Sequence, residues 1–286
     1  MFVIDKKFSM IKQSGKIGVF DSGLGGLTIL KEIIRLMPNR EYLYLGDNLH
    51  APYGDKSQAD IFKYTLAGVE WLFDNGAEIV ILACNTASSN ALRKIQQEIM
   101  PFKYSDKKVL GIIIPTVEDM GNVSRSGHIG VLATKATVAS MTFETEMKRY
   151  NSKIQITCQS GGDLANLIEQ DKDQAMLRVE IKNVTAELIN KNKLIDVVVL
   201  GCTHYDLIID QMRLILPKNI KVVGQGNAVA TKLLEYINRH DELRRKLKNE
   251  FSVNFHTTSD REEVKKLMAQ FYGANISVSM VTYKML

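Results

Sequence analysis

Apolar and polar positions follow two different periodicities along this chain. Short runs that are almost entirely apolar, such as 78–83, are typical of parallel strands that are buried on both faces. Longer segments between them carry apolar residues every three or four positions, as at Leu27, Leu30, Ile34 and Met37, and this spacing predicts amphipathic helices. Strands that alternate with helices predict parallel sheets with right-handed crossovers.

Both periodicities continue to the end of the chain. Strands are predicted at 16–20, 42–45, 78–83, 109–114, 127–133, 153–157, 196–200, 251–256 and 276–282, with a further one from residue 220. Helices are predicted at 24–37, 57–74, 87–99, 136–150, 163–170, 174–191, 207–216, 227–247 and 260–271. The second of these helices opens with Ser57 and Asp60, which have the spacing of a capping box.

A weak internal repeat divides the chain into two halves. The run IGVFDS from Ile17 is echoed by IGVLAT from Ile129, and ILACNT in the first half is echoed by VLGCTH in the second. Each half therefore places a cysteine, Cys84 or Cys202, just after the carboxyl end of an apolar strand, where open α/β sheets bind ligands. We predict an α/β fold of two similar doubly wound domains, with mainly parallel sheets that face each other across a central cleft.

Composition agrees with a globular protein. The chain has 286 residues, a length that suits one large or two medium domains. Hydrophobic residues make up 45% of it and charged residues 24%, as is usual for globular proteins. The net charge is +5, but the lysines and arginines are scattered, so no nucleic-acid partner is predicted. No apolar stretch reaches the ~18 residues of a membrane span, and the first residues do not have the pattern of a signal peptide. We expect a soluble cytoplasmic protein without a membrane partner.

The cysteines are the main candidates for chemistry. They number three and lie far apart, which favours free thiols over a disulfide framework. Cys84 and Cys202 each lie where a strand turns into a helix, and the positive end of a helix dipole is expected to lower a thiol pKa. Small polar neighbours could hold a carboxylate there. Cys158 has no matched context, and we expect it to be inert.

Two matched thiols suit the exchange of a proton at one carbon. Racemisation removes a proton from one face of a carbon and returns one to the other face, which a single base cannot easily do for a held substrate. One thiolate and one thiol on opposite walls solve this geometry. The site would also need fixed donors for the charge that develops.

Asp21 and His204 are predicted to lie at the same sheet edges as the two cysteines. Asp21 follows the first strand and could accept a proton on the Cys84 side or hold a substrate ammonium; its alternative role is to cap the helix at 24–37. His204 is two residues from Cys202 and could favour its thiolate or shuttle a proton, unless it is structural. The glycine-rich run GLGGL lacks the spacing of a phosphate loop.

Other site classes explain the pattern less well. Cys84, Cys202 and His204 could bind a metal, but no CxxC or HxxxH spacing supports this, so no metal is predicted. A Cys-His nucleophile for acyl transfer would leave the matched cysteine without a role. A nucleotide-binding redox protein would be expected to retain flavin or nicotinamide.

Several motifs together resemble the glutamate racemases of the aspartate/glutamate racemase superfamily. They are IGVFDSGLGGLT (17–28), YLGDNLHAPYG (44–54), ACNTAS (83–88), IGVLAT (129–134), LGCTHY (200–205) and the tail segment 255–273. The match runs in order over nearly the whole chain. Any one of these motifs alone would be weak, but the set is specific.

The resemblance implies roles for individual residues. Cys84 would take the proton from D-glutamate and Cys202 from L-glutamate, with Asp21 and His204 as supporting residues. Residues implied to bind or line the substrate site are Ser22, Tyr53, Gly54, Asn85, Thr86, Thr203 and either Thr134 or Thr137. No cofactor is implied, and the D-glutamate formed would enter peptidoglycan.

The resemblance also implies an architecture and a partner. One domain would comprise 1–112 with 224–286, and the other 113–223. A homodimer is implied, with glutamate as the small-molecule substrate. The alternatives are an aspartate or hydantoin racemase of the same superfamily and a catalytically silent relative that only binds a ligand.

Three positions depart from the usual pattern of this family. Glu169 stands near the family's acidic position beside the second cysteine, but its spacing from Cys158 is altered, so its alternative is an exposed carboxylate at a helix end. Asp206 replaces a frequent Pro after CTHY, and Gln225 replaces a frequent Asp. We treat Glu169 as a candidate catalytic helper.

Overall fold

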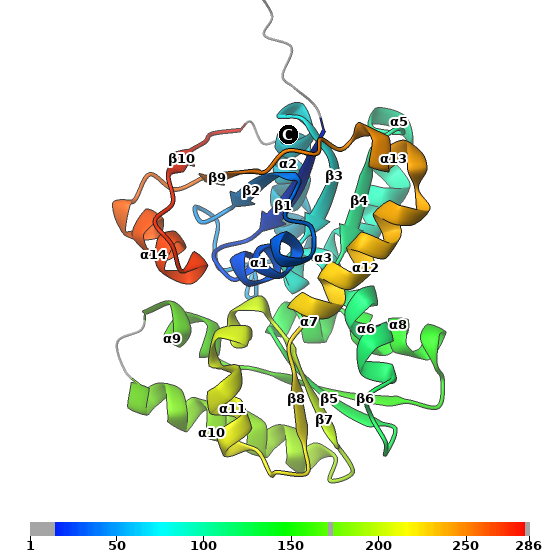
Figure 1. The fold of residues 1–286 in the computed structure, drawn as a ribbon. Coiled ribbons are helices and arrows are strands. Elements are labelled where there is room, and N and C mark those ends of the chain that lie inside the picture. The colour runs from blue at the N-terminus through cyan, green and yellow to red at the C-terminus, as the bar shows by residue number, and fades with distance from the viewer. Residues whose placement is uncertain (1–14, 171–173, 284–286) are drawn as a thin grey trace, which may run out of the picture.

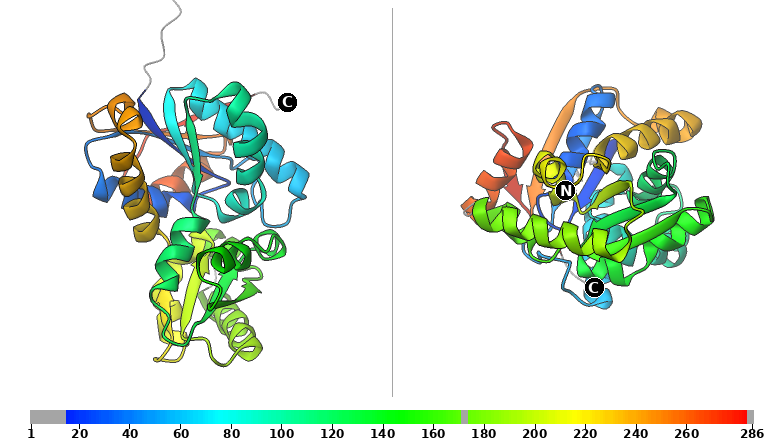
Figure 2. Two further views of the ribbon diagram at one scale, coloured as in Figure 1. Left: turned by 90° about the vertical axis from the view of Figure 1, so that its right-hand side faces the viewer. Right: turned by 90° about the horizontal axis from the view of Figure 1, so that it is seen from below.

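The computed structural model describes residues 15–170 and 174–283. These residues form two lobes, one above the other in Figure 1, and each lobe is built around its own sheet. The two further views in Figure 2 show the same division into two lobes. The carboxyl ends of both central sheets face the junction between the lobes (Figure 1).

Both sheets have parallel strand pairing throughout. The first sheet has the order β10-β9-β2-β1-β3-β4 and the second the order β6-β5-β7-β8. The strands of the first are β1 (Lys16–Asp21), β2 (Glu41–Gly46), β3 (Ala77–Leu82), β4 (Lys108–Gly111), β9 (Ser252–Thr257) and β10 (Val278–Met280). Those of the second are β5 (His128–Ala133), β6 (Gln155–Ser160), β7 (Val197–Gly201) and β8 (Lys221–Val223). The predicted α/β class with two parallel sheets is confirmed.

Helices connect the strands and cover the sheets. In the first lobe they are α1 (Gly26–Leu36), α2 (Gln58–Asp74), α3 (Asn85–Asn90), α4 (Leu92–Lys94), the π-helix η1 (Ile95–Ile99), α5 (Met100–Lys103), α12 (Gly226–Arg239), α13 (Asp241–Lys246) and α14 (Glu262–Tyr272). In the second they are α6 (Ile113–Gly121), α7 (Lys135–Ala139), α8 (Thr142–Tyr150), α9 (Leu164–Gln170), α10 (Gln174–Lys191), the 3-10 helix η2 (Thr203–Ile208) and α11 (Ile209–Ile215). The predicted cap of α2 is present, because the Asp60 backbone N–H donates to Oγ of Ser57.

The internal repeat of the sequence is also a repeat of topology. The segment β2-β1-β3-β4 in the first sheet has the same order as β6-β5-β7-β8 in the second. In both, the strand that opens the half lies beside the strand that precedes the cysteine. Cys84 and Cys202 therefore follow equivalent strands, β3 and β7.

Some predicted element boundaries are wrong. The strand predicted at 109–114 ends at Gly111, and α6 begins at Ile113, because a short apolar run does not distinguish a buried strand from a buried helix start. The helix predicted at 136–150 is interrupted at Met141, which has a left-handed φ of 54°. The helix predicted at 227–247 is divided at His240.

Two crossings connect the sheets. The chain leaves the first sheet after β4 and enters α6, and it leaves the second after β8 and enters α12, which packs against α1 (Figure 1). No helix within the described residues is both long and apolar enough to cross a lipid bilayer.

The packing of α2 on β1 gives a test of the fold. Gly68 lies within α2, and a Cβ there would lie 2.2 Å from Cε2 of Phe20, which is fully buried on β1. Alanine has the higher helix propensity by about 1 kcal/mol, whereas overpacking costs about 1–3 kcal/mol. We expect Gly68→Ala to lower the free energy of unfolding in urea by about 1 kcal/mol. The same change in a Phe20→Leu background should cost less, and a Gly68→Ala protein more stable than wild type would contradict this packing.

Candidate active site

A cavity of about 480 Å³ lies at the junction of the lobes and takes its walls from both. Most of the predicted site residues line it: Ser22, Tyr53, Gly54, Cys84, Asn85, Thr86, Glu169, Cys202, Thr203 and His204. Cys84 comes from the end of β3 in one lobe and Cys202 from the end of β7 in the other. Both thiols are free and buried, so two sulfurs from opposite lobes reach one cavity.

Local structure positions Cys84 tightly. It is the N-cap residue of α3, where the Ala87 backbone N–H lies 3.4 Å from its Sγ, and Oγ of Ser22 lies 3.1 Å away on the other side. Burial raises the pKa of the Cys84 thiol to about 12, and the nearby charge of Asp21 adds to this effect. The Ala87 backbone N–H at the start of α3 lowers this pKa, as predicted for a helix end, but burial outweighs it, so the expected net lowering is wrong for Cys84.

Asp21 lies behind the cavity wall. It is 1% exposed, and its Oδ2 accepts a hydrogen bond of 3.0 Å from the Gly23 backbone N–H. The Gly26 backbone N–H at the start of α1 also donates to its carboxylate, whereas Oδ1 has no partner within the described residues. Burial raises the pKa of Asp21, and the charge of His204 opposes this shift. The N-cap residue of α1 is Gly25 and not Asp21, whereas the charge of Asp21 acts on Cys84.

Cys202 belongs to a chain of three titratable side chains. Its Sγ lies 3.8 Å from Nδ1 of His204, and Nε2 of the same ring lies 2.6 Å from Oε1 of Glu169. Burial lowers the pKa of His204, but its hydrogen bonds with Cys202 and Glu169 outweigh that effect and raise it well above the usual value. The imidazolium therefore holds a positive charge beside the Cys202 sulfur.

The glycine-rich turn after β1 allows this close approach of the two lobes. A Cβ at Gly25 would lie 2.4 Å from Oγ1 of Thr203 and 2.7 Å from Nδ1 of His204. Any larger residue would push the second lobe away from the first. The run GLGGL thus has a packing role, in agreement with its lack of a phosphate-loop spacing.

A cluster of threonine hydroxyls joins the lobes at another part of the wall. Oγ1 of Thr86 lies 2.9 Å from that of Thr134, which donates to Thr137 at 3.0 Å. Thr86 and Thr134 line the cavity, and Thr137 lies behind them, 1% exposed. Of the two threonines suggested by the sequence for this position, Thr134 is therefore the one on the cavity surface.

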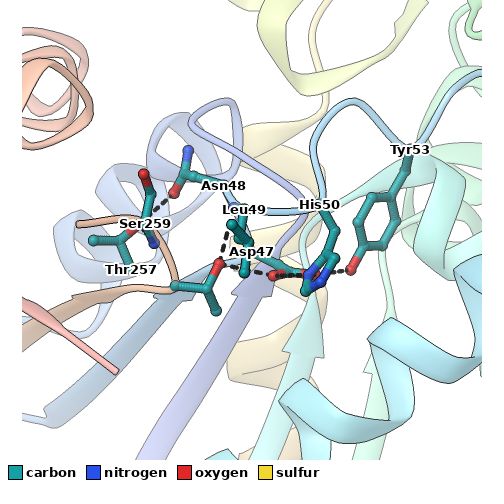
Figure 3. A network of polar contacts seen from close by, with 8 residues as sticks. Asp47, Asn48, Leu49, His50, Tyr53, Thr257 and Ser259 are labelled. Carbon is teal, nitrogen blue, oxygen red and sulfur yellow. Dashed lines mark hydrogen bonds and ion pairs between the residues drawn. The ribbon is translucent and has the colours of Figure 1, made fainter. Parts of the chain in front are cut away.

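The loop after β2 is anchored through a buried carboxylate. Figure 3 shows Asp47 at the centre of this network, with dashed lines to His50 and Tyr53. The Tyr53 hydroxyl donates to Oδ2 of Asp47, and Oγ1 of Thr258 donates to Oδ1 at 2.8 Å. Asp47 thereby fixes Tyr53 on the cavity wall and ties this loop to the segment that follows β9.

The sequence analysis did not assign any site residue to the C-terminal segment. The structure brings Arg261, Glu263, Val264 and Leu267 to the cavity from the start of α14. The sequence analysis missed them because they are far from both cysteines along the chain. The only signal was that segment 255–273 is one of the motifs that resemble the family. Within the described residues, no group of three or more His, Cys, Asp or Glu side chains is arranged to hold a metal ion.

The geometry supports acid-base chemistry on one small substrate. Two sulfurs face one cavity, each with its own polar neighbours: Ser22 on one side and His204 on the other. Hydroxyl and amide groups of Asn85, Thr86 and Thr203 line the space between them. Such a cavity can hold a charged polar molecule and offer a proton donor and acceptor to it.

Comparisons with known proteins agree with this geometry. The sequence pattern of the Asp/Glu/Hydantoin racemase family matches residues 17–233. The glutamate racemase of Roseobacter denitrificans is 37% identical over 273 residues, which cover 92% of this chain and 98% of its own length. That of Dinoroseobacter shibae is 36% identical and covers 93% of this chain and 98% of its own length.

Solved structures of glutamate racemases also resemble this fold over nearly its whole length. Glutamate racemase isoform RacE1 from Bacillus anthracis has a TM-score of 0.85 and 28% identity, over 95% of this chain and 98% of its own. Glutamate racemase from Francisella tularensis in complex with D-glutamate has a TM-score of 0.82 and 29% identity, over 94% of this chain and 98% of its own. The protein described here belongs to the Asp/Glu/Hydantoin racemase family.

Proposed function

We propose that this enzyme is a glutamate racemase that interconverts L- and D-glutamate and supplies D-glutamate for peptidoglycan. The observation that carries the proposal is the pair of thiols, Cys84 and Cys202, which reach one cavity from equivalent strand ends of two lobes. The relatives named as glutamate racemases supply the choice of substrate. Side chains provide both acid-base groups, so the proposed reaction uses no cofactor.

In the direction from L- to D-glutamate, Cys202 acts as the base. The His204 imidazolium stabilises negative charge on its sulfur, and Glu169 in turn stabilises the imidazolium. The thiolate takes the α-proton of L-glutamate. The Cys84 thiol gives its proton to the opposite face of the same carbon, which forms D-glutamate and leaves a thiolate on Cys84.

The opposite direction begins from that Cys84 thiolate. It takes the α-proton of D-glutamate, and the Cys202 thiol donates to the other face. Between successive L-to-D turnovers one proton must pass from Cys202 to Cys84 through solvent, and between successive D-to-L turnovers one proton must pass from Cys84 to Cys202. The substrate ammonium offsets the effect of burial and of Asp21, both of which raise the pKa of the Cys84 thiol and so disfavour its thiolate.

The cavity walls offer partners for each end of glutamate. Ser22, Asn85, Thr86 and Thr203 are proposed to bind the α-amino and α-carboxylate groups. Tyr53, Gly54 and Thr134 on the cavity wall, with Thr137 behind Thr134, are proposed to hold the remainder of the molecule. A homodimer, a cytoplasmic location, the absence of nucleic-acid or membrane partners, and the domain limits 1–112 with 224–286 and 113–223 remain predictions.

Substitution of either thiol tests the two-base mechanism. We expect Cys84→Ser and Cys202→Ser each to lower kcat/KM for both enantiomers by about 10²–10⁴-fold, because a serine hydroxyl is a far weaker acid at this position. The circular dichroism of glutamate in the assay mixture follows racemisation. The far-ultraviolet spectrum of each purified variant, recorded separately, reports whether it is folded. Cys158→Ser is the matched control and should keep full activity. Full activity in either Cys84→Ser or Cys202→Ser would rule out the mechanism.

The assay should include L- and D-aspartate beside the two glutamates. We expect glutamate to react with the larger kcat/KM. A preference for aspartate would instead place the chain with the aspartate racemases of the same family, while leaving the two-thiol chemistry in place.

Substitution of Glu169 tests its support of His204. The raised pKa of His204 means that the ring keeps its proton until the pH passes that value, so Glu169→Gln should shift this loss to lower pH. A charge-assisted hydrogen bond of about 1.5–3 kcal/mol corresponds to a shift of about one to two pH units. NMR titration of the histidine ring protons measures it, and the ring of His128 at the far end of β5 serves as an internal control. An unchanged His204 midpoint would remove Glu169 from the mechanism.

A further inference from the structure

A buried glutamine joins the active site to both crossings between the lobes. Gln225 is fully buried at the N-cap of α12, where the chain returns from the second sheet to the first lobe. Its side chain reaches Asn85, which follows Cys84, and Thr116 in α6, where the chain first leaves for the second lobe. Neither contact involves a residue close to it in sequence, and no motif of the sequence analysis assigned Gln225 a role.

The amides of Gln225 and Asn85 form a reciprocal pair. Nδ2 of Asn85 donates to Oε1 of Gln225 at 2.6 Å, and Nε2 of Gln225 donates to Oδ1 of Asn85 at 3.0 Å. Both side chains are almost completely buried, at 2% and 0% exposure. Breaking such a pair would leave buried polar groups without partners, which costs about 1–3 kcal/mol per group.

Thr116, the third residue in this network, determines the orientation of the two amides. The Thr116 hydroxyl donates to the carbonyl oxygen of Ile112 at 2.7 Å, so its oxygen must accept from Nε2 of Gln225, at 2.9 Å. This identifies Nε2 as the end of the Gln225 amide that faces Thr116, while Nε2 and Oε1 both bond the Asn85 amide. The orientation of the Asn85 amide follows, because its Nδ2 must face Oε1 of Gln225.

Asn85 keeps bonding capacity on the cavity side. An asparagine amide has two N–H donors and two acceptor lone pairs, and the pair with Gln225 uses one of each. One donor and one acceptor therefore remain for the cavity that Asn85 lines. A carboxylate needs the donor and an ammonium group needs the acceptor, and a flipped amide would exchange their positions.

We infer that Gln225 is a positioning residue that orients the Asn85 amide for the substrate's α-amino and α-carboxylate groups, with Thr116 setting the direction. This inference rests on the proposed function only for the identity of the substrate. It also links the site to the joint between the lobes, since Thr116 and Gln225 lie on the two crossings. The backbone N–H of Gln225 is held in turn by the carboxylate of Asp206.

Two variants separate positioning from stability. Gln225→Leu removes the amide pair, and Thr116→Val removes only the group that sets its direction. We expect Gln225→Leu to raise KM for both enantiomers about tenfold and Thr116→Val to raise it about threefold, with kcat changed less than twofold. Since the enantiomers have equal free energies in water, kcat/KM must fall by the same factor in both directions, which checks the data internally.

Thr185→Val is the matched control for Thr116→Val. The Thr185 hydroxyl is buried at 3% exposure and donates to the carbonyl oxygen of Ile181 at 2.6 Å, four residues earlier in its helix, as Thr116 does with Ile112. Both variants should lower Tm by a similar amount, but Thr185→Val should leave KM unchanged. A lower Tm without a change in KM for Thr116→Val and Gln225→Leu would reduce Gln225 to a structural residue and overturn the inference. Thr116→Val alone decides the question if Gln225→Leu does not fold.

A measurement that does not depend on activity distinguishes this inference from the proposed function. The Asn85 side-chain amide signal, assigned by its loss in Asn85→Asp, should exchange slowly with water in the wild type and in Thr185→Val. It should shift and exchange faster in Gln225→Leu and Thr116→Val. An unchanged signal in both would overturn the positioning role even in an active racemase. A wild-type protein inactive on glutamate would instead overturn the proposed function, while this signal still decides the role of Gln225.

Discussion

The structure depends on bringing the carboxyl ends of two sheets so close that one small molecule contacts both. The turn after β1 shows how tight this constraint is, since a Cβ at Gly25 would overlap Thr203 and His204 of the other lobe. The approach buries Asp21, Cys84 and His204 together. Their burial costs free energy unless hydrogen bonds or opposite charges compensate, and each of the three has at least one such partner. The chemistry and the packing of the junction are therefore consequences of the same arrangement.

The repeat supplies equivalent strands but not equivalent surroundings. Cys84 meets a serine hydroxyl and the charge of Asp21, and its pKa is raised to about 12. Cys202 meets the imidazolium of His204, which Glu169 stabilises. One sulfur therefore holds its proton firmly, and the other lies beside a positive charge. This is the arrangement that the proposed deprotonation of L-glutamate by Cys202 and its reprotonation by Cys84 require.

Much of this could be predicted from the sequence, because apolar strands and the residues at their carboxyl ends are local signals. The pattern predicted the two sheets and the position of Cys84 and Cys202 at equivalent strand ends. The boundary near Ile113 failed because a strand and a helix start share the same short apolar run. The raised pKa of Cys84 and the cavity position of Arg261 depend on burial and distant contacts, which no local pattern records. The same holds for the bond between Asn85 and Gln225, 140 positions apart.

The central claim is that two different groups remove and return the proton, and the fate of hydrogen in D₂O tests it most directly. Purified protein is incubated with L-glutamate, without added cofactor, and the α-hydrogen is followed by NMR early in the reaction. The account predicts that the D-glutamate formed carries deuterium at Cα, while the remaining L-glutamate still carries its original hydrogen. Retention of the original hydrogen in the D-glutamate would mean that a single base serves both faces and would contradict the account.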